Sequence, residues 1–168
     1  MQLLKNVHWI VSAEATGKKF NYIRWPGNYQ TLIQNIKKIQ QLPHKVTINM
    51  TWNLLCVSNI IDFIDEMLEM GVHPNQFIMN CVQDPIEQSV RNITKQRRDN
   101  LVEIIKQKQS KINKNFFLFK VYTEMLDVLN QPLLDTHKTA LYNTLMDFDT
   151  KRKLNSKEVF PELYKEGI

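Results

Sequence analysis

The chain has 168 residues, of which 43% are hydrophobic and 23% charged, and its formal net charge is +5. That composition is typical of one soluble globular domain or a piece of one. No apolar run approaches the roughly 20 residues of a membrane span, and MQLLKNVHW lacks the apolar region of a signal peptide. Two cysteines, Cys56 and Cys81, exclude a disulfide framework and a CxxC metal site. We therefore expect a cytoplasmic protein with reduced thiols and no membrane contact.

The first predicted element is a strand over residues 7–15, VHWIVSAEA. Its residues alternate, so that Trp9 and Val11 point to one side while Ser12 and Glu14 point to the other. Residues 15–28, ATGKKFNYIRWPGN, follow it and contain two glycines and a proline. We interpret this segment as a turn-rich link without regular structure.

Helices and strands then alternate as far as residue 84. Residues 29–42 predict an amphipathic helix with Asn28 as its N-cap, and residues 58–71 predict a second helix that Gly71 ends. Strands are predicted at 45–53, KVTINMTWN, and at 76–84, QFIMNCVQD. Strand, helix, strand, helix, strand is the pattern of consecutive parallel strands with helical crossovers on one face of the sheet.

Short uncharged polar side chains mark the other face of the predicted sheet. In the second strand, Thr47, Asn49, Thr51 and Asn53 alternate with apolar residues. This row is either an ordinary solvated strand face or the wall of a site that hydrogen-bonds a small ligand. Polar residues also fall near the carboxyl ends of the other two strands, where parallel α/β folds bind ligands. These residues are Ser12, Glu14, Asn80 and Asp84.

From residue 85 onward the sequence predicts helices, over 98–112, 116–130 and 134–149, and then a short terminal helix or ordered tail. We place a boundary near residue 90, with an α/β part over 1–90 and a helical part over 91–168. The basic residues between Arg97 and Lys114 form either a solvated helix face or a surface that binds nucleic acid or another protein. Sheets that bind RNA stack its bases on aromatic side chains, and the Thr/Asn row contains none, which weighs against RNA binding on this face.

The first strand leaves an open question. Three parallel strands make a small sheet, and the outer edge of the first strand carries apolar side chains such as Trp9. Native proteins rarely leave such an edge unpaired. Either the later helices fold back over it, or further strands lie in another chain or in other sequence.

Two segments resemble the radical SAM superfamily, especially its twitch-domain-containing members. VSAEATGKKFNYIRWPGNYQTLIQNI resembles that group's fourth strand and the segment after it, and DFDTKRKLNSKEVFPELY resembles its closing segment. The resemblance spans nearly the whole chain. The matching residues are Ser12-Ala13-Glu14, Gly17, Tyr22-Ile23-Arg24, Asn35-Ile36, Asp149, Arg152 and Phe160-Pro161-Glu162-Leu163.

The resemblance implies an α/β fold, in which residues 1–90 are the later half of a partial (βα)6 barrel and residues 91–168 a twitch-like, substrate-side region. It also implies S-adenosylmethionine (SAM) as cofactor. Ser12 and Glu14 would then hydrogen-bond the cofactor around its ribose, with Glu14 in place of the usual Asp. Arg24 would pair with the methionyl carboxylate, which suits a guanidinium fork. The cavity would be lined on the next strands by Asn49, Asn53 and Asn80.

The family's Cys-x3-Cys-x2-Cys loop is absent, and two cysteines cannot supply the three thiolates of its 4Fe–4S cluster. No cysteine follows Cys81, so we expect no second cluster. The chain is then a C-terminal fragment without catalytic or metal-ligating residues, inactive until a cluster-binding half is supplied, for example by a separate chain. It would be a truncated, split or partial gene product. The sequence does not identify its substrate, for which a peptide and a small molecule are the candidates. The sequence shows no hydrolase motif.

Overall fold

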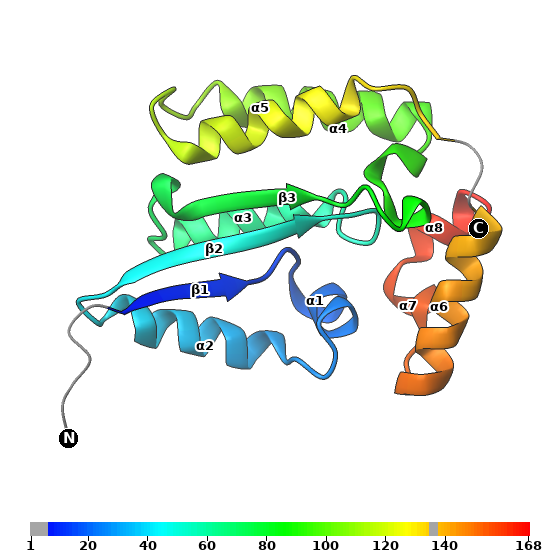
Figure 1. Cartoon of the computed structure of the whole chain (residues 1–168), viewed down its shortest axis with the longest axis horizontal. Helices are drawn as coiled ribbons and strands as arrows, with labels where there is room; N and C mark the ends of the chain where they lie inside the picture. Colours follow the sequence, from blue (N-terminus) through cyan, green and yellow to red (C-terminus); the bar gives the residue numbers. More distant parts are fainter. Residues whose placement is uncertain (1–6, 135–137) are drawn as a thin grey trace.

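The computed structural model describes residues 7–134 and 138–168, and it is an α/β protein with a three-stranded parallel sheet. The strands β1 (His8–Ser12), β2 (Lys45–Trp52) and β3 (Phe77–Cys81) lie side by side in sequence order (Figure 1). All three run in the same direction, so their carboxyl ends meet at one edge of the sheet. The predicted strand, helix, strand, helix, strand order is confirmed.

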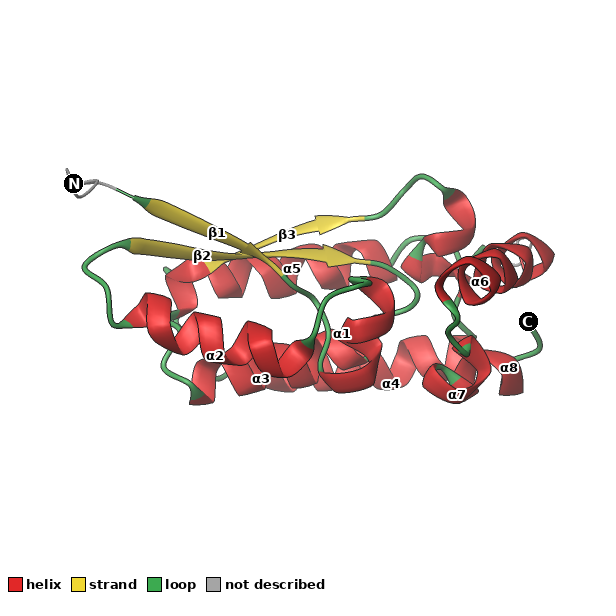
Figure 2. Ribbon diagram, turned by 90° about the horizontal axis from the view of Figure 1, so that it is seen from below, coloured by secondary structure: helices red, strands yellow, loops and turns green. Residues whose placement is uncertain are grey.

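Helices α2 (Tyr29–Gln40) and α3 (Asn59–Glu69) pack against one face of the sheet (Figure 2). The Asn28 side chain accepts a hydrogen bond from the Thr31 amide and caps α2 as predicted. Gly71, with φ at +87°, follows α3 in the left-handed conformation that glycine adopts without steric cost.

The segment expected to be a turn-rich link contains a helix instead, α1 (Gly17–Ile23). The helix forms because Phe20 and Tyr22 bury their rings, which compensates for its short length and for the absence of a capping side chain. The turn expected from the Pro-Gly pair follows α1, where the Gly27 amide donates to the Arg24 carbonyl at 2.6 Å.

After β3 come short 3-10 turns and then an antiparallel helix pair, α4 (Lys95–Gln109) and α5 (Phe117–Leu129). The turns η2 (Ile86–Gln88) and η3 (Val90–Asn92) connect β3 to α4, and η1 (Pro74–Gln76) precedes β3. Helix α5 runs along β3 and contacts it, so that this edge of the sheet is covered (Figure 1).

The remaining helices, α6 (Lys138–Arg152), α7 (Ser156–Val159) and α8 (Pro161–Lys165), lie beyond the carboxyl ends of the strands (Figure 1). The predicted terminal helix is thus two short helices. The third predicted helix, over 134–149, corresponds to α6, which the structure describes from Lys138 to Arg152, and His137 lies outside the described residues. Across the described ranges, no helix combines the length and the hydrophobicity that a bilayer span needs.

The core fills the space between the sheet and its helices. It holds the apolar side of the alternating β2 row, including Ile48, Met50 and Trp52, against the buried side chains of α3. The Trp52 indole N–H donates to the Val57 carbonyl at 3.1 Å, so its polar atom is satisfied inside the core.

The opposite face of the sheet carries no helix (Figure 2). The outer edge of β1 is likewise unpaired by any strand in the described part of the chain, because β1 hydrogen-bonds β2 alone. The later helices do not fold back over this edge, which was the first of the two explanations given above. Helices α4 and α5 lie at the β3 side, and α6–α8 lie beyond the strand ends (Figure 1).

Candidate functional site at the carboxyl end of the sheet

Three of the six predicted site residues lie next to one another on the open face. Ser12 pairs with Asn49 in the register of β1 and β2, and Thr51 pairs with Asn80 in that of β2 and β3. The Asn80 Nδ2 donates to the Asn49 Oδ1 at 3.1 Å. Because the strands are parallel, these side chains form a continuous polar row across the sheet near its carboxyl edge.

The rest of the open face carries one histidine, His8, and one charged side chain, that of Lys45, which pairs with His8 in the register of β1 and β2. The His8 Nε2 lies 2.8 Å from the Thr47 Oγ1, and Ile10 is 60% exposed beside them. A face of hydroxyls, amides and exposed isoleucines can hydrogen-bond and cover a neutral group, and its one fixed charge, on Lys45, lies at the amino end of β2, away from the polar row. The face-forming residues are His8, Ile10, Ser12, Lys45, Thr47, Asn49, Thr51, Ile78 and Asn80.

A buried ion pair lies just past the end of β1. The Arg24 Nε and Nη2 donate to the two oxygens of Glu14 at 2.9 and 2.6 Å. The Glu14 side chain is 1% exposed and the Arg24 side chain 33%. Burial raises the pKa of the Glu14 carboxyl above its ordinary value, and the Arg24 guanidinium opposes that shift.

The ion pair holds the Arg24 side chain in place and leaves neither oxygen of Glu14 without a donor. Both Glu14 oxygens accept from Arg24, whereas the Arg24 Nη1 has no hydrogen-bond acceptor among the described residues. The Glu14 carboxylate thus binds one side of the Arg24 guanidinium, and the Nη1 group on its other side can bind an external anion. A ribose contact to Glu14, as the resemblance implies, requires this ion pair to open.

Asn53 is not brought together with the other predicted residues. It is buried, and its Oδ1 accepts from the amides of Leu55 and Cys56 at 2.9 and 3.2 Å. Its Nδ2 donates to the Thr51 carbonyl at 3.4 Å. These bonds are those of an Asx turn that ends β2, so the side chain serves the loop and not the open face.

The two segments that carry the family resemblance meet in the fold. The Tyr22 hydroxyl donates to the Asp149 Oδ1 at 2.9 Å, and the Arg152 Nη1 donates to the Tyr22 carbonyl at 3.4 Å. The Phe160 ring packs edge-on against Tyr22 with a centroid distance of 5.0 Å. Asp149 also accepts from the Ser156 amide and hydroxyl. We call Tyr22, Asp149, Arg152, Ser156 and Phe160 the C-terminal clasp.

The clasp holds the helix that precedes Arg24. Burial, followed by the hydrogen bond to Asp149, raises the pKa of the Tyr22 phenol, so its hydroxyl remains a donor. The resemblance had pointed to Tyr22, Asp149, Arg152 and Phe160 without a role for them, and it had not pointed to Ser156. The two motifs that contain these residues lie far apart in the sequence, and the fold places them side by side.

The cysteines do not fit an iron–sulfur cluster. Cys56 is fully buried beside the Thr51 and Asn53 carbonyls, and Cys81 is half-buried on β3. Burial raises the pKa of both thiols, which disfavours the thiolate that binds iron. Within residues 7–134 and 138–168, no group of three or more His, Cys, Asp or Glu side chains could hold a metal ion.

Most of the basic residues of α4 form ion pairs within the fold. Arg97 pairs with Glu166 at 3.4 Å and lies 3.8 Å from Glu162, and Lys108 pairs with Asp65 at 2.5 Å. Lys95 and Arg98 both contact Asp99. Among the basic residues of α4, Lys106 alone has no carboxylate from the described part of the chain within ion-pair distance.

A hollow of about 420 Å³ lies between η3, α6 and α8, away from the polar row. Its lining is mostly apolar, includes Leu54, Ile93 and Leu163, and contains none of the six predicted site residues. The polar row is thus part of an open surface and not of an enclosed pocket.

No protein-family model matches the sequence, and comparisons with curated proteins and with solved structures found no match.

Proposed function

We propose that this chain is the C-terminal part of a radical SAM enzyme and that its sheet is the later half of a partial (βα)6 barrel. The observation that supports this most is the row Ser12, Asn49 and Asn80 across the carboxyl ends of three parallel strands. The bare face and the bare β1 edge fit the same proposal, since further barrel strands would pair with the edge and enclose the face.

The exposed groups fit a nucleoside with an amino-acid end. Ser12, Asn49 and Asn80 offer hydroxyl and amide groups for ribose and base, and Arg24 offers a guanidinium for a carboxylate. Glu14 holds Arg24 in place from the buried side. When SAM is bound and reduced at a cluster, it supplies a 5′-deoxyadenosyl radical.

The cluster itself has to be held by other sequence, since two buried or half-buried thiols are too few for it. We infer that a cluster-binding half, on the same polypeptide or on a separate one, pairs its last strand with β1. In this arrangement the helical region α4–α8 closes the substrate side of the barrel. Its substrate would be a peptide or a small molecule that meets the polar open face.

The test begins with the nucleotide sequence next to the coding region, searched for a Cys-x3-Cys-x2-Cys loop. A polypeptide that contains this loop is co-expressed with the chain, and the purified complex is reconstituted with iron and sulfide. We expect a 4Fe–4S cluster in the complex and 5′-deoxyadenosine on reduction with SAM.

Two variants sharpen that experiment. Arg24→Lys keeps the charge but loses the bidentate geometry, so SAM affinity measured by calorimetry should fall about tenfold while iron content stays the same. Lys37→Met, on the far helix α2, should change neither. A stoichiometric cluster in the isolated chain, or unchanged SAM affinity in Arg24→Lys, would refute the proposal.

A further inference from the structure

The turn between α4 and α5 has an unusual charge pattern for a chain of mixed composition. Residues 104–123 contain five lysines and neither Asp nor Glu. Of these five, Lys108 is neutralised by Asp65. In the part of the chain that the structure describes, no carboxylate lies within ion-pair distance of the other four. These four are Lys106, Lys111, Lys114 and Lys120.

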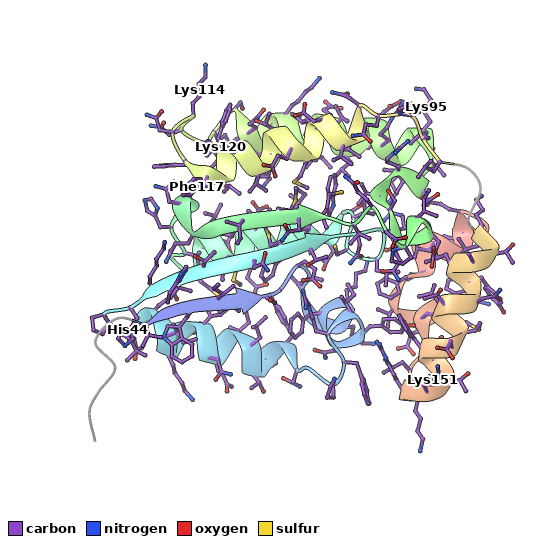
Figure 3. All side chains as sticks on the ribbon, viewed as in Figure 1. His44, Lys95, Lys114, Phe117, Lys120 and Lys151 are labelled. Atoms are coloured by element: carbon purple, nitrogen blue, oxygen red, sulfur yellow. The ribbon has the colours of Figure 1, made fainter. Side chains whose placement is uncertain are left out.

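An exposed aromatic ring lies beside Lys114 and Lys120 (Figure 3). Phe117, the first residue of α5, is 50% exposed, and the Lys120 Nζ lies 5.4 Å from its ring centroid. Figure 3 shows Lys114, Phe117 and Lys120 at one corner of the molecule, whereas Lys95 lies at the other end of the helix pair. We call Lys106, Lys111, Lys114, Phe117 and Lys120 the corner patch.

The corner patch stands on ordered backbone. The Phe117 amide donates to the Asn75 Oδ1 at 3.0 Å, which ties the start of α5 to η1. Next to it, the Phe116 ring packs edge-on against His73 with a centroid distance of 5.2 Å. The Phe117 ring is therefore held in solvent at the start of an ordered helix. Exposing this apolar surface to water is unfavourable, and no contact within the described part of the fold requires it.

We propose that the corner patch binds single-stranded nucleic acid, with the lysines on the phosphates and an unpaired base on Phe117. The lysine charges attract the phosphate backbone. The exposed Phe117 ring can stack on any of the bases, because every base has an aromatic face. The neighbouring side chains Gln107, Asn113 and Asn115 are exposed amides, which hydrogen-bond bases and sugars. An acidic membrane fits less well, because a single exposed aromatic ring among amides offers too little apolar surface to enter a bilayer.

This proposal changes the location that the sequence suggested for a basic surface. The stretch Arg97–Lys114 was the candidate, but Arg97 and Lys108 are committed to carboxylates within the fold. The free charge begins at the end of α4 and continues into α5. The corner patch lies on the α4–α5 pair at the β3 side, whereas the proposed barrel closure lies at β1 (Figure 1). The two proposals can therefore fail independently.

The experiment titrates a fluorescently labelled 20-nucleotide single strand with the purified chain. We expect a dissociation constant of about 10 μM at 50 mM salt. With about three phosphates contacted, affinity should fall about 20-fold between 50 and 200 mM salt. A complementary duplex of the same length should bind more weakly, because its bases cannot stack on Phe117.

Two double variants test whether binding depends on the lysines of the corner patch or only on the net charge of the protein. Lys111→Glu combined with Lys114→Glu should weaken binding at least tenfold. Lys37→Glu combined with Lys38→Glu makes the same charge change on two exposed lysines of α2 and should leave affinity within about twofold. Phe117→Ala should weaken binding about fivefold or more by loss of stacking. Melting curves of each variant establish that it is folded.

Several results would overturn the proposal. Equal losses in the two lysine pairs would show attraction by net charge alone, and equal affinity for the duplex would exclude stacking. Absence of binding at 50 mM salt would exclude the site. Sedimentation with vesicles containing one third anionic lipid, without affinity for the oligonucleotide, would assign the patch to a membrane surface.

Discussion

The Glu14–Arg24 pair places a carboxylate with 1% exposure behind a guanidinium, and each depends on the other for its hydrogen bonds. Arg24→Met should lower the free energy of unfolding by about 3 kcal/mol at pH 7.5, because it leaves a buried carboxylate without a partner. Chemical denaturation followed by circular dichroism measures the change.

The loss should shrink as the pH falls. Burial already raises the pKa of Glu14, and without Arg24 nothing with a full charge opposes that shift. Between the ordinary pKa and the raised one, the folded state binds more protons than the unfolded state, so stability decreases as the pH rises. Arg24→Met should therefore be closer to the parent protein at pH 5 than at pH 7.5, and adding Glu14→Gln should remove this pH dependence. An equal loss at both pH values would show that Glu14 is not the cause.

Lys153 is the one non-glycine residue with a positive φ among the described residues, at 54°, directly after α6. The Leu154 amide donates to the Asp149 carbonyl at 3.1 Å, which is the bond pattern of a helix that ends in the left-handed conformation. Lys153→Gly should raise the free energy of unfolding by about 0.5 kcal/mol, since relief of the side-chain clash exceeds the added chain entropy.

A matched control lies two residues earlier. Lys151→Gly falls in the last turn of α6 and should instead lower stability by about 1 kcal/mol. Thermal unfolding of the two variants should thus shift in opposite directions. Shifts of the same sign would mean that the backbone at Lys153 imposes no strain.

At the scale of elements, alternation and helical periodicity predicted the three strands and the helices around them, because burial of one face controls both patterns. Helix α1 could not be predicted in this way. Its seven residues are too few for a clear period, and it exists because Phe20 and Tyr22 find partners in distant sequence, including Phe160. Local turn residues therefore pointed to a loop where tertiary packing forms a helix.

The C-terminal clasp carries a prediction at this scale. Asp149→Ala removes the acceptor of the Ser156 amide and the closer acceptor of the Tyr22 hydroxyl, which then keeps only the Leu145 carbonyl at 3.4 Å. It should cost about 2–3 kcal/mol because these donors stay buried. Asp147→Ala, on the same helix but exposed and paired with Lys151, should cost less than about 0.5 kcal/mol.

Hydrogen exchange locates the effect of that change. If the clasp holds α1, Asp149→Ala should speed exchange of the α1 amides more than that of the β2 amides. Uniform acceleration across both elements would show that Asp149 supports the whole fold and not α1 in particular.

At the scale of the molecule, part of the candidate site followed from the sequence and part did not. Ser12, Asn49 and Asn80 were predictable because strand alternation and parallel direction together place them at one edge. The role of Asn53 was not, since a period-two pattern cannot show where a strand ends and an Asx turn begins. The Glu14–Arg24 pair was also missed, because its geometry depends on the path of α1.

The open edge of β1 leads to the last prediction. Unpaired backbone beside an apolar side chain is a template for association, and Ile10 is 60% exposed there. The isolated chain should therefore self-associate as its concentration rises, as sedimentation velocity would show. Ile10→Lys should keep it monomeric at little cost in stability, since the side chain is already in solvent. Ile104→Lys adds the same charge at an exposed position of α4, away from any strand edge, and should not. If both variants suppress association equally, or if the parent chain stays monomeric, the edge needs no partner strand, and the proposed barrel half loses one of the structural observations that support it.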